Sequence, residues 1–198
     1  MPGAILTDDP ILLRKAELRS AALSRRDALP AEERARAAEA VAARGLPVAA
    51  AGRIVSGYMP IRSEMSPLPL LRRLADAGIS LALPAIAGRG RPLVMRAWSF
   101  GAPLQRGQWG IREPGPDAAA VVPDILITPL AAFDRRGGRI GYGAGYYDMT
   151  IAKARAEKRA IAVGLAFAAQ EIDAVPMLPH DQHLDFVLTE RETIACGA

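Results

Sequence analysis

Apolar residues recur at helical spacing in the first part of the chain. Asp9 and Pro10 suit an N-cap and a first helical position, and the apolar and cationic positions that follow predict a helix over 10–27. An alanine-rich stretch over 30–44 predicts a second helix, because acidic residues lie near its start and Gly45 suits the position after its end. Two helices are therefore expected before the first strand.

Short apolar runs then alternate with further helical patterns. Strands are predicted over 53–58, 79–83, 93–98, 125–128, 160–166 and 185–189, and helices over 66–78 and 145–158. Pro84 is expected to stop the second strand, and the last strand is expected to close the sheet. The run at 125–128 is apolar almost throughout, which indicates a central strand buried on both faces. The region 100–121 is rich in glycine and proline and predicts a long irregular loop.

This order of elements indicates an α/β fold. Strands alternate with helices and the chain has no internal repeat, which favours an open, mainly parallel sheet flanked by helices. A chain of 198 residues that is 51% hydrophobic can bury one full core. We therefore expect a single domain over residues 1–198, and a monomer.

Composition and charge argue against several classes of protein. The net charge of +4 is modest for this length and the few aromatic residues are scattered, so a nucleic-acid partner is not expected. No apolar run approaches the roughly 18 residues of a membrane-spanning helix, and the N-terminus has no pattern of a secretory signal. The single cysteine, Cys196, cannot form an internal disulfide, which fits a reducing compartment. A cytoplasmic protein with no membrane partner is therefore expected.

The candidate chemistry centres on a glycine-rich loop. Glycine occupies positions 141, 143 and 145, so the backbone there can adopt positive φ and approach a ligand closely. Because a helical pattern follows directly, the amides of Gly143, Ala144 and Gly145 are expected to be free donors at a helix N-terminus, where an anion is favoured. Cations before the loop and one carboxylate after it complete the pattern: Arg135, Arg136, Arg139 and Asp148. Such a combination is typical of a nucleotide with a divalent metal.

The loop matches neither of two standard phosphate-binding motifs. No lysine followed by a hydroxyl residue comes after Gly145, as a P-loop requires. Tyr146 stands where the dinucleotide fingerprint needs its third glycine. Glycine-rich turns without a ligand are common, so the spacing alone leaves a phosphate cradle and a structural turn both open.

The residues around this loop resemble a known family signature. The segments 128–134 and 138–148 are closely similar to the signature of the 5-formyltetrahydrofolate cyclo-ligases, also called methenyltetrahydrofolate synthetases. The segment 109–114 resembles the family's Trp-x-Ile-x-x-Pro segment, and Gln170 with 180–185 resembles its C-terminal block. The resemblance therefore extends over most of the chain.

The resemblance implies that 5-formyltetrahydrofolate is converted, with ATP and Mg²⁺, to 5,10-methenyltetrahydrofolate, ADP and phosphate. The γ-phosphoryl group would move to the formyl oxygen, after which the anilino nitrogen of the folate closes the ring and phosphate departs. The implied nucleotide contacts are Lys15, Arg19, Arg139, Gly141, Gly143, Ala144, Gly145 and Tyr146. The implied folate contacts are Tyr58, Glu64, Trp109, Tyr146 and Tyr147. Among the implied residues, Arg139 and Tyr147 would be catalytic, and Asp148 and Asp185 would bind Mg²⁺.

Several of these positions also have simpler interpretations. Lys15 and Arg19 are four residues apart and share one face of the first helix, which without the resemblance is more typical of an ordinary solvated face. Glu64 follows a predicted strand, where ligands gather in open α/β sheets, yet sequence alone favours a loop carboxylate with a capping role. Asp148 and Asp185 have alternatives as a helix-turn acid and a strand-end acid.

Three other functions fit parts of the sequence. A transition-metal cluster is one, but histidines three apart outside a helix control geometry poorly. Its ligands would be His180, Asp181, His183 and Asp185. The segment 97–101 nearly matches the nucleophile elbow of serine hydrolases, but the elbow needs a helix directly after it, which Pro103 disfavours. A non-catalytic nucleotide- or folate-binding module on the same fold would bind ATP without consuming it.

Overall fold

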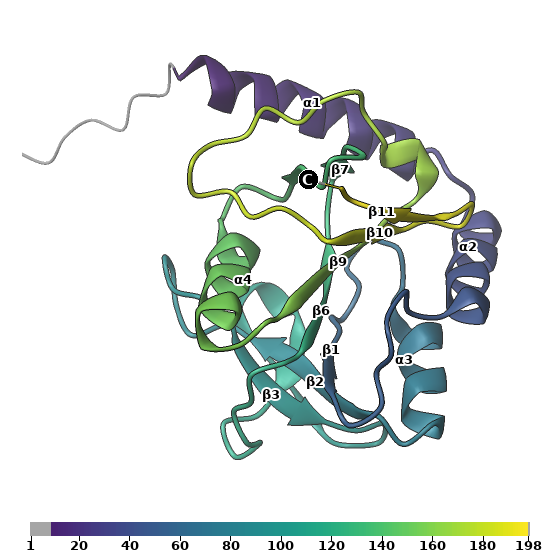
Figure 1. Cartoon of the computed structure of the whole chain (residues 1–198), viewed down its shortest axis with the longest axis vertical. Coiled ribbons are helices and arrows are strands. Elements are labelled where there is room, and N and C mark those ends of the chain that lie inside the picture. Colours follow the sequence, from purple (N-terminus) through teal and green to yellow (C-terminus); the bar gives the residue numbers. More distant parts are fainter. Residues whose placement is uncertain (1–8, 198) are drawn as a thin grey trace, which may run out of the picture.

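The computed structural model describes residues 9–197 (Figure 1), and within them four α-helices flank a seven-stranded sheet. The helices are α1 (Pro10–Asp27), α2 (Ala31–Arg44), α3 (Leu68–Asp76) and α4 (Tyr146–Glu157). In the order of the sheet, the strands are β11 (Thr193–Ala195), β10 (Phe186–Leu188), β9 (Ile161–Leu165), β6 (Ile125–Pro129), β1 (Ile54–Ser56), β2 (Ser80–Ala85) and β3 (Val94–Trp98). Two hairpins lie outside this sheet: β4 (Leu104–Arg106) with β5 (Arg112–Pro114), and β7 (Ala132–Phe133) with β8 (Arg139–Ile140).

The sheet is parallel through its centre and antiparallel at both edges. The strands β10, β9, β6, β1 and β2 pair in parallel, whereas β11 and β3 run antiparallel to their neighbours. Parallel strands need both faces covered, and every residue of β6 is buried. The expected fold class is therefore confirmed: an open, mainly parallel α/β sheet flanked by helices in a single domain.

The two faces of β6 contribute to two separate cores. Ile125 and Ile127 belong to the core that α2 and α3 cover, while Leu126 belongs to the core that contains Ile151 and Ala154 of α4. This division follows from the period of two along a strand. Figure 1 shows the same arrangement, with α2 and α3 on one side of the sheet and α4 on the other.

Helix α1 lies across one end of the sheet rather than on a face (Figure 1). The Asp9 side chain caps it by accepting the Ile11 amide at 2.8 Å, as the sequence predicts. The buried Ala22 shares an apolar cluster with Ala132 of β7 and Ile140 of β8, so the helix packs on the β7–β8 hairpin. At 18 residues α1 is the longest of the four, yet neither it nor any other helix of the described chain has the length and apolarity needed to cross a membrane.

Three details of the strands differ from expectation. Strand β2 continues through Pro84 to Ala85, because β1 ends opposite Ala82 and leaves Pro84 beyond it, where a missing amide is tolerated. Strand β10 does not close the sheet, since the short strand β11 pairs beyond it. The region 100–121 is not irregular throughout, since it contains the β4–β5 hairpin and the 3₁₀ helix η1 (Gln108–Gly110).

Candidate active site

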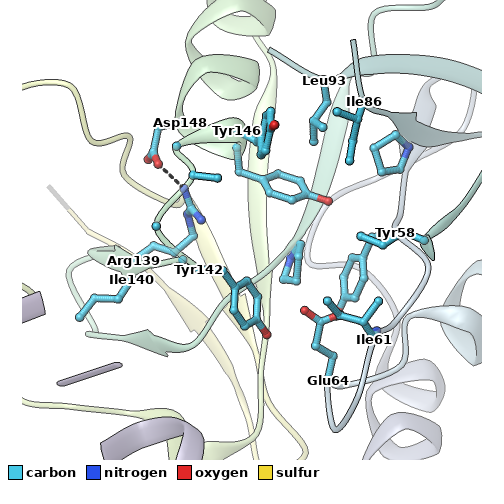
Figure 2. A pocket seen from close by; sticks show the side chains of 18 of the residues that line it. Tyr58, Ile61, Glu64, Ile86, Leu93, Arg139, Ile140, Tyr142, Tyr146 and Asp148 are labelled. Carbon is cyan, nitrogen blue, oxygen red and sulfur yellow. Dashed lines mark hydrogen bonds and ion pairs between the residues drawn. The ribbon is translucent and has the colours of Figure 1, made fainter. Parts of the chain in front are cut away.

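A cavity of about 300 Å³ lies where the central parallel strands end. Its walls come from the carboxyl ends of β1 and β6, the loop 59–64, the glycine loop 141–145, the first turn of α4 and one face of α1. The β4–β5 hairpin contributes a further wall. Open α/β sheets bind ligands at this end of their strands. Figure 2 shows side chains from the loop 59–64, the glycine loop and the first turn of α4 converging on the cavity.

The structure brings to this cavity all but one of the site residues that the resemblance implies. Those on α1, on the glycine loop and on α4 meet there, although more than a hundred residues of sequence separate α1 from α4. The predicted residues that line the cavity are Lys15, Arg19, Tyr58, Glu64, Trp109, Arg139, Gly141, Gly143, Ala144, Gly145, Tyr146, Tyr147 and Asp148. The exception is Asp185.

Asp185 lies outside the cavity lining. Its Oδ2 accepts hydrogen bonds from Arg155 Nη2 and from the Ala162 amide, both at 2.7 Å. Those contacts tie the start of β10 to α4 and β9, so the carboxylate is engaged in holding the sheet together. Asp148 lines the cavity and Asp185 does not, so the two carboxylates predicted to share a metal ion do not face one cavity.

The other sites that the sequence suggests are not assembled either. Within residues 9–197, no three His, Cys, Asp or Glu side chains are grouped closely enough to hold a metal ion. His180 is exposed, and His183 contacts the Arg136 carbonyl at the surface. Strand β3 leads through a turn into the β4–β5 hairpin, so Ser99 is not followed by the helix that a nucleophile elbow needs.

The glycine loop presents free backbone amides at the start of α4. Gly143 and Gly145 have φ angles of 97° and 68°, in the left-handed region that favours glycine. Gly145 is the N-cap of α4 and offers no side-chain cap. None of the amides of residues 143–148 donates a hydrogen bond to a group within residues 9–197. The donors expected at 143–145 are thus free, and the first turn of α4 adds more, which favours an anion here.

Arg139 is a buried cation beside these amides. It lies on β8 and is 4% exposed, and its Nη2 is 2.8 Å from Asp148 Oδ2 (Figure 2). That contact does not have the geometry of a hydrogen bond, so Nη2 has no hydrogen-bond partner within the described residues. Nε has none within them either. The guanidinium packs on Gly141, where a Cβ would lie 2.9 Å from Nη1. A buried guanidinium with two unpaired nitrogens is costly unless a further acceptor binds it.

Helix α1 contributes two cations to the cavity. Lys15 is buried, and its ammonium pairs with the buried carboxylate of Asp181. Arg19 Nε donates to the Gly141 carbonyl at 2.7 Å and so holds the glycine loop. This face of α1 is therefore not the ordinary solvated face that the sequence alone favours.

The two arginines at the β7–β8 turn do not reach the cavity. Arg135 pairs at the surface with Glu171 and Glu192, each at 2.6 Å. Arg136 is exposed and lies 3.4 Å from Asp134, whose buried carboxylate accepts three backbone amides around the turn. These residues stabilise the hairpin that carries Arg139, so the expectation that they flank a bound phosphate is wrong.

A buried carboxylate faces tyrosines on the other side of the cavity (Figure 2). Glu64 Oε2 accepts the Ile61 amide at 2.9 Å. Burial raises the pKa of Glu64, while that backbone hydrogen bond and the Tyr142 hydroxyl oppose the rise. The Tyr58 hydroxyl donates to the Met65 carbonyl at 2.5 Å, so it fixes the loop that carries Glu64 while the residue lines the cavity.

Trp109 lines the cavity from the tip of the β4–β5 hairpin. Its backbone is left-handed, with φ of 59°, and 68% of the residue is exposed. The ring centroid lies 5.7 Å from that of Tyr146 in an edge-to-face arrangement. With Ile86 and Leu93 these rings form an apolar wall, which suits a flat heterocyclic ligand.

Five further polar residues line the cavity that are not among the nucleotide, folate or magnesium contacts implied by the resemblance. They are Arg112, Glu113, which accepts the Ile86 amide at 3.1 Å, Tyr142, His180 and Asp181. Each lies in a segment that carries the family resemblance. The resemblance does not say which side chain of a segment turns inward, so only the tertiary structure identifies them.

The fold and the cavity together define an α/β domain whose cavity places free backbone amides and cations next to an apolar wall. The model of the 5-formyltetrahydrofolate cyclo-ligase family matches residues 12–190. The 5-formyltetrahydrofolate cyclo-ligase of Mycolicibacterium smegmatis is 35% identical over 91% of this chain and 95% of its own. That of Escherichia coli K12 is 31% identical over 83% and 94%. The chain therefore belongs to the 5-formyltetrahydrofolate cyclo-ligase family, and it is a ligase of folate metabolism.

Solved structures agree with this assignment. The NMR structure of 5,10-methenyltetrahydrofolate synthetase from Aquifex aeolicus is similar with a TM-score of 0.77 and 30% identity, over 92% of both chains. A 5,10-methenyltetrahydrofolate synthetase from Mycoplasma pneumoniae is similar with a TM-score of 0.69, over 89% of this chain and 98% of its own. At 19% identity the second similarity concerns the fold alone.

Proposed function

We propose that this enzyme converts 5-formyltetrahydrofolate to 5,10-methenyltetrahydrofolate, consuming ATP in the presence of Mg²⁺ and releasing ADP and phosphate. The observation that carries the proposal is the Arg139 guanidinium, which is buried beside the free amides of the glycine loop and whose Nε and Nη2 have no hydrogen-bond partner among the described residues. Asp148 supplies a counter-charge, but two buried guanidinium nitrogens without hydrogen bonds remain costly unless a further acceptor group binds them. The phosphates of ATP are such a group, and a helix N-terminus favours them.

The nucleotide phosphates bind on the side of the cavity between α1 and α4. Here the backbone donates from the glycine loop, and side chains from α1 and β8 supply positive charge. Ala144 carries no charge, so the cations come from outside the loop. We assign to the phosphates the backbone at Gly141, Gly143, Ala144, Gly145 and Tyr146, and the side chains of Lys15, Arg19 and Arg139.

Asp148 is the side chain that we assign to Mg²⁺. It lies in the first turn of α4, with Oδ1 accepting the Gln182 amide at 3.1 Å and Oδ2 facing Arg139. One carboxylate suffices, because Mg²⁺ in nucleotide sites is held by one or two carboxylates together with phosphates and water. When bound, the ion would neutralise charge on the phosphates. Asp185 has no part in this assignment.

The folate binds on the opposite, more apolar side of the cavity. Trp109 and Tyr146 supply flat walls for its ring system, and Glu64 supplies a carboxylate that can accept hydrogen bonds from ring nitrogens. Tyr58 and Tyr147 complete this side. The formyl group is thereby held next to the nucleotide side, so that positioning contributes to the rate.

The reaction starts from a poor electrophile, since an N-formyl oxygen is a poor leaving group. Transfer of the γ-phosphoryl group to that oxygen breaks its bond to ADP and makes the oxygen a good leaving group. The anilino nitrogen then attacks the formyl carbon and loses its proton, the ring closes, and phosphate departs. Arg139 stabilises the charge on the transferring group. Burial raises the pKa of Tyr147, so its hydroxyl stays protonated and can donate to the formyl oxygen.

An absorbance assay tests the proposal directly. Purified full-length protein is mixed with ATP, MgCl₂ and 5-formyltetrahydrofolate, and the methenyl product and ADP are measured in parallel. We expect equal amounts of both products, and neither when ATP or magnesium is omitted. Binding of ATP and folate without formation of ADP would contradict the proposal and identify a non-catalytic binding module.

A further inference from the structure

A buried arginine that lies outside the cavity lining links the two loops on either side of it. Arg26 lies in the last turn of α1 and is 2% exposed. Its Nη1 donates to the Tyr142 hydroxyl at 2.6 Å, and its Nε donates to Ser63 Oγ at 3.0 Å. Tyr142 belongs to the glycine loop, and Ser63 belongs to the loop that carries Glu64. One guanidinium therefore holds both loops.

The hydrogen bond from Arg26 determines the direction of the Tyr142 hydroxyl. Because Nη1 donates to the Tyr142 oxygen, the hydroxyl hydrogen is left to donate elsewhere. The Glu64 carboxylate is the acceptor next to it (Figure 2). The polar contacts thus run in one order, from Arg26 to the Tyr142 hydroxyl and from that hydroxyl toward Glu64, which lines the cavity.

The charge of Glu64 depends on few neighbours. Burial disfavours its ionised form and raises its pKa, while Arg26 is the buried cation that opposes this effect. Arg62, the other cation near it, is exposed on the same loop as Glu64. The titratable groups that face Glu64 from α1, its own loop, the end of β1, the glycine loop and α4 are Arg26, Arg62, Tyr58, Tyr142 and Tyr147.

The contact with Tyr142 is not needed to anchor the loop that carries Glu64. Ser63 Oγ already donates to Asp27 Oδ1, and Arg26 Nε lies 3.5 Å from the same oxygen. These contacts fasten the loop to the end of α1 without any group of the cavity. The hydrogen bond from Arg26 to Tyr142 instead reaches a residue of the cavity lining, which points to a role in arranging the site.

We propose that Arg26 is a positioning residue which, acting through the Tyr142 hydroxyl, fixes the orientation and the charge of the Glu64 carboxylate on the folate side of the cavity. This inference rests on the proposed function, in which Glu64 contacts the folate. Arg19 lies two turns earlier on the same face of α1 and holds the Gly141 carbonyl on the nucleotide side instead. Arg26 therefore acts on the folate side of the cavity, and Arg19 acts on the nucleotide side.

Steady-state kinetics of Arg26→Gln and Tyr142→Phe test this division. Because the charged hydrogen bond from Arg26 is lost, each variant should raise the KM for 5-formyltetrahydrofolate roughly tenfold, with the KM for ATP changed by less than about threefold. Arg26→Lys keeps the charge but cannot donate to Ser63 and Tyr142 together, so it should recover only part of the loss. An increase in the KM for ATP instead of folate would overturn the inference.

Arg25→Gln is the matched control. Arg25 is the neighbouring residue on α1, but its Nε donates to the Ala169 carbonyl at 2.7 Å, away from the cavity. Both KM values of this variant should stay within about twofold of the wild type. Melting curves of all variants establish whether each is folded. If Arg26→Gln fails to fold, Tyr142→Phe still tests the inference, because it removes only one oxygen atom.

A second measurement does not depend on activity. The Glu64 carboxyl carbon is titrated by ¹³C NMR in the free protein, with Glu64→Gln identifying its signal. Loss of the supporting hydrogen bond should raise the pKa of Glu64 further in Tyr142→Phe and in Arg26→Gln, but not in Arg25→Gln. The acid limb of kcat/KM for the folate should move to higher pH in the same two variants.

The two measurements separate the possible failures. If Glu64 titrates identically in all variants, the link from Arg26 is absent, whatever the enzyme catalyses. If the wild type forms no methenyl product, the proposed function fails, while the titration of Glu64 still decides whether Arg26 acts on that carboxylate.

Discussion

Arg139 Nη2 lies 2.8 Å from Asp148 Oδ2, so an ion pair joins the two ends of the glycine loop. Arg139 precedes the loop on β8, and Asp148 follows it in the first turn of α4. The left-handed backbone of Gly143 and Gly145 lets the chain turn back between them. The pair thereby keeps the guanidinium, the carboxylate and the free amides on one side of the cavity.

Asp148→Asn should abolish turnover, with a loss on the order of 100-fold or more, because the assigned metal carboxylate is removed while the shape of the side chain is kept. Arg139 then loses its counter-charge, so the free energy of unfolding should fall by about 1–3 kcal/mol and leave the protein folded. Methenyl formation and urea denaturation measure the two effects.

Asp185→Asn is the control for this variant. Asp185 contacts Arg155 and Ala162 rather than the cavity, so its loss should reduce stability and leave kcat within about twofold. An active Asp148→Asn enzyme, or an inactive but folded Asp185→Asn enzyme, would contradict the assignment of Asp148 alone to the metal.

Asp181→Asn tests the ion pair with Lys15. The side chains are 8% and 9% exposed, so removal of the carboxylate leaves a buried ammonium without a counter-charge, which costs about 3–5 kcal/mol. A bound phosphate would restore a partner for Lys15. Mg-ATP should therefore raise the melting temperature of the variant by more than that of the wild type. Equal shifts in differential scanning fluorimetry would remove Lys15 from the nucleotide contacts.

Glu64→Gln should stabilise the protein at neutral and alkaline pH while impairing folate binding. Burial raises the pKa of Glu64 in the folded state, so between its unfolded and folded pKa values the folded protein binds more protons. The Glu64 contribution to the free energy of unfolding therefore falls as pH rises through that window. Glutamine removes this effect, so the melting temperature should rise more at pH 8 than at pH 5.

The control for this prediction is Glu157→Gln. Glu157 is exposed on α4 and pairs loosely with Lys153 at 3.9 Å, so its substitution should change the melting temperature little at either pH. The KM for 5-formyltetrahydrofolate should rise roughly tenfold in Glu64→Gln alone. A melting temperature for Glu64→Gln that shifts equally at both pH values would show that Glu64 titrates normally in the folded protein.

The fold is predictable from the sequence where its signals are local. The cap at Asp9 and the apolar run that becomes β6 are each encoded within a few neighbouring residues, so their elements appear as expected. The continuation of β2 through Pro84 depends on the place where β1 ends, and β11 depends on pairing with β10. Neither property belongs to a local pattern, because tertiary pairing decides them.

The same distinction applies to the site. The contiguous run from Arg139 to Asp148 assembles as the sequence predicts, since loop and helix fix its geometry locally. Asp181 and Asp185 lie four residues apart in one segment, yet Asp181 reaches the cavity and Asp185 binds Arg155. Contacts with residues distant in sequence decide which of the two carboxylates faces the cavity. Such contacts also decide that Arg26 is buried.

Gly145→Ala separates the backbone role of the glycine loop from its contribution to stability. Gly145 has φ of 68° and an added Cβ would meet nothing within 4 Å. Gly78, which follows α3 and does not line the cavity, has φ of 77° and equally open surroundings. A residue other than glycine in the left-handed region costs about 1–2 kcal/mol, so both alanine variants should lose about the same free energy of unfolding.

The kinetics of these two variants should differ. Relief of the strain at position 145 redirects the amides at the start of α4, so Gly145→Ala should raise the KM for ATP roughly tenfold. Gly78→Ala should keep the wild-type KM, because its backbone is remote from the cavity. Chemical denaturation and steady-state kinetics provide both measurements. If the two variants lose equal stability and both keep the wild-type KM for ATP, the amides of this loop do not bind the phosphates.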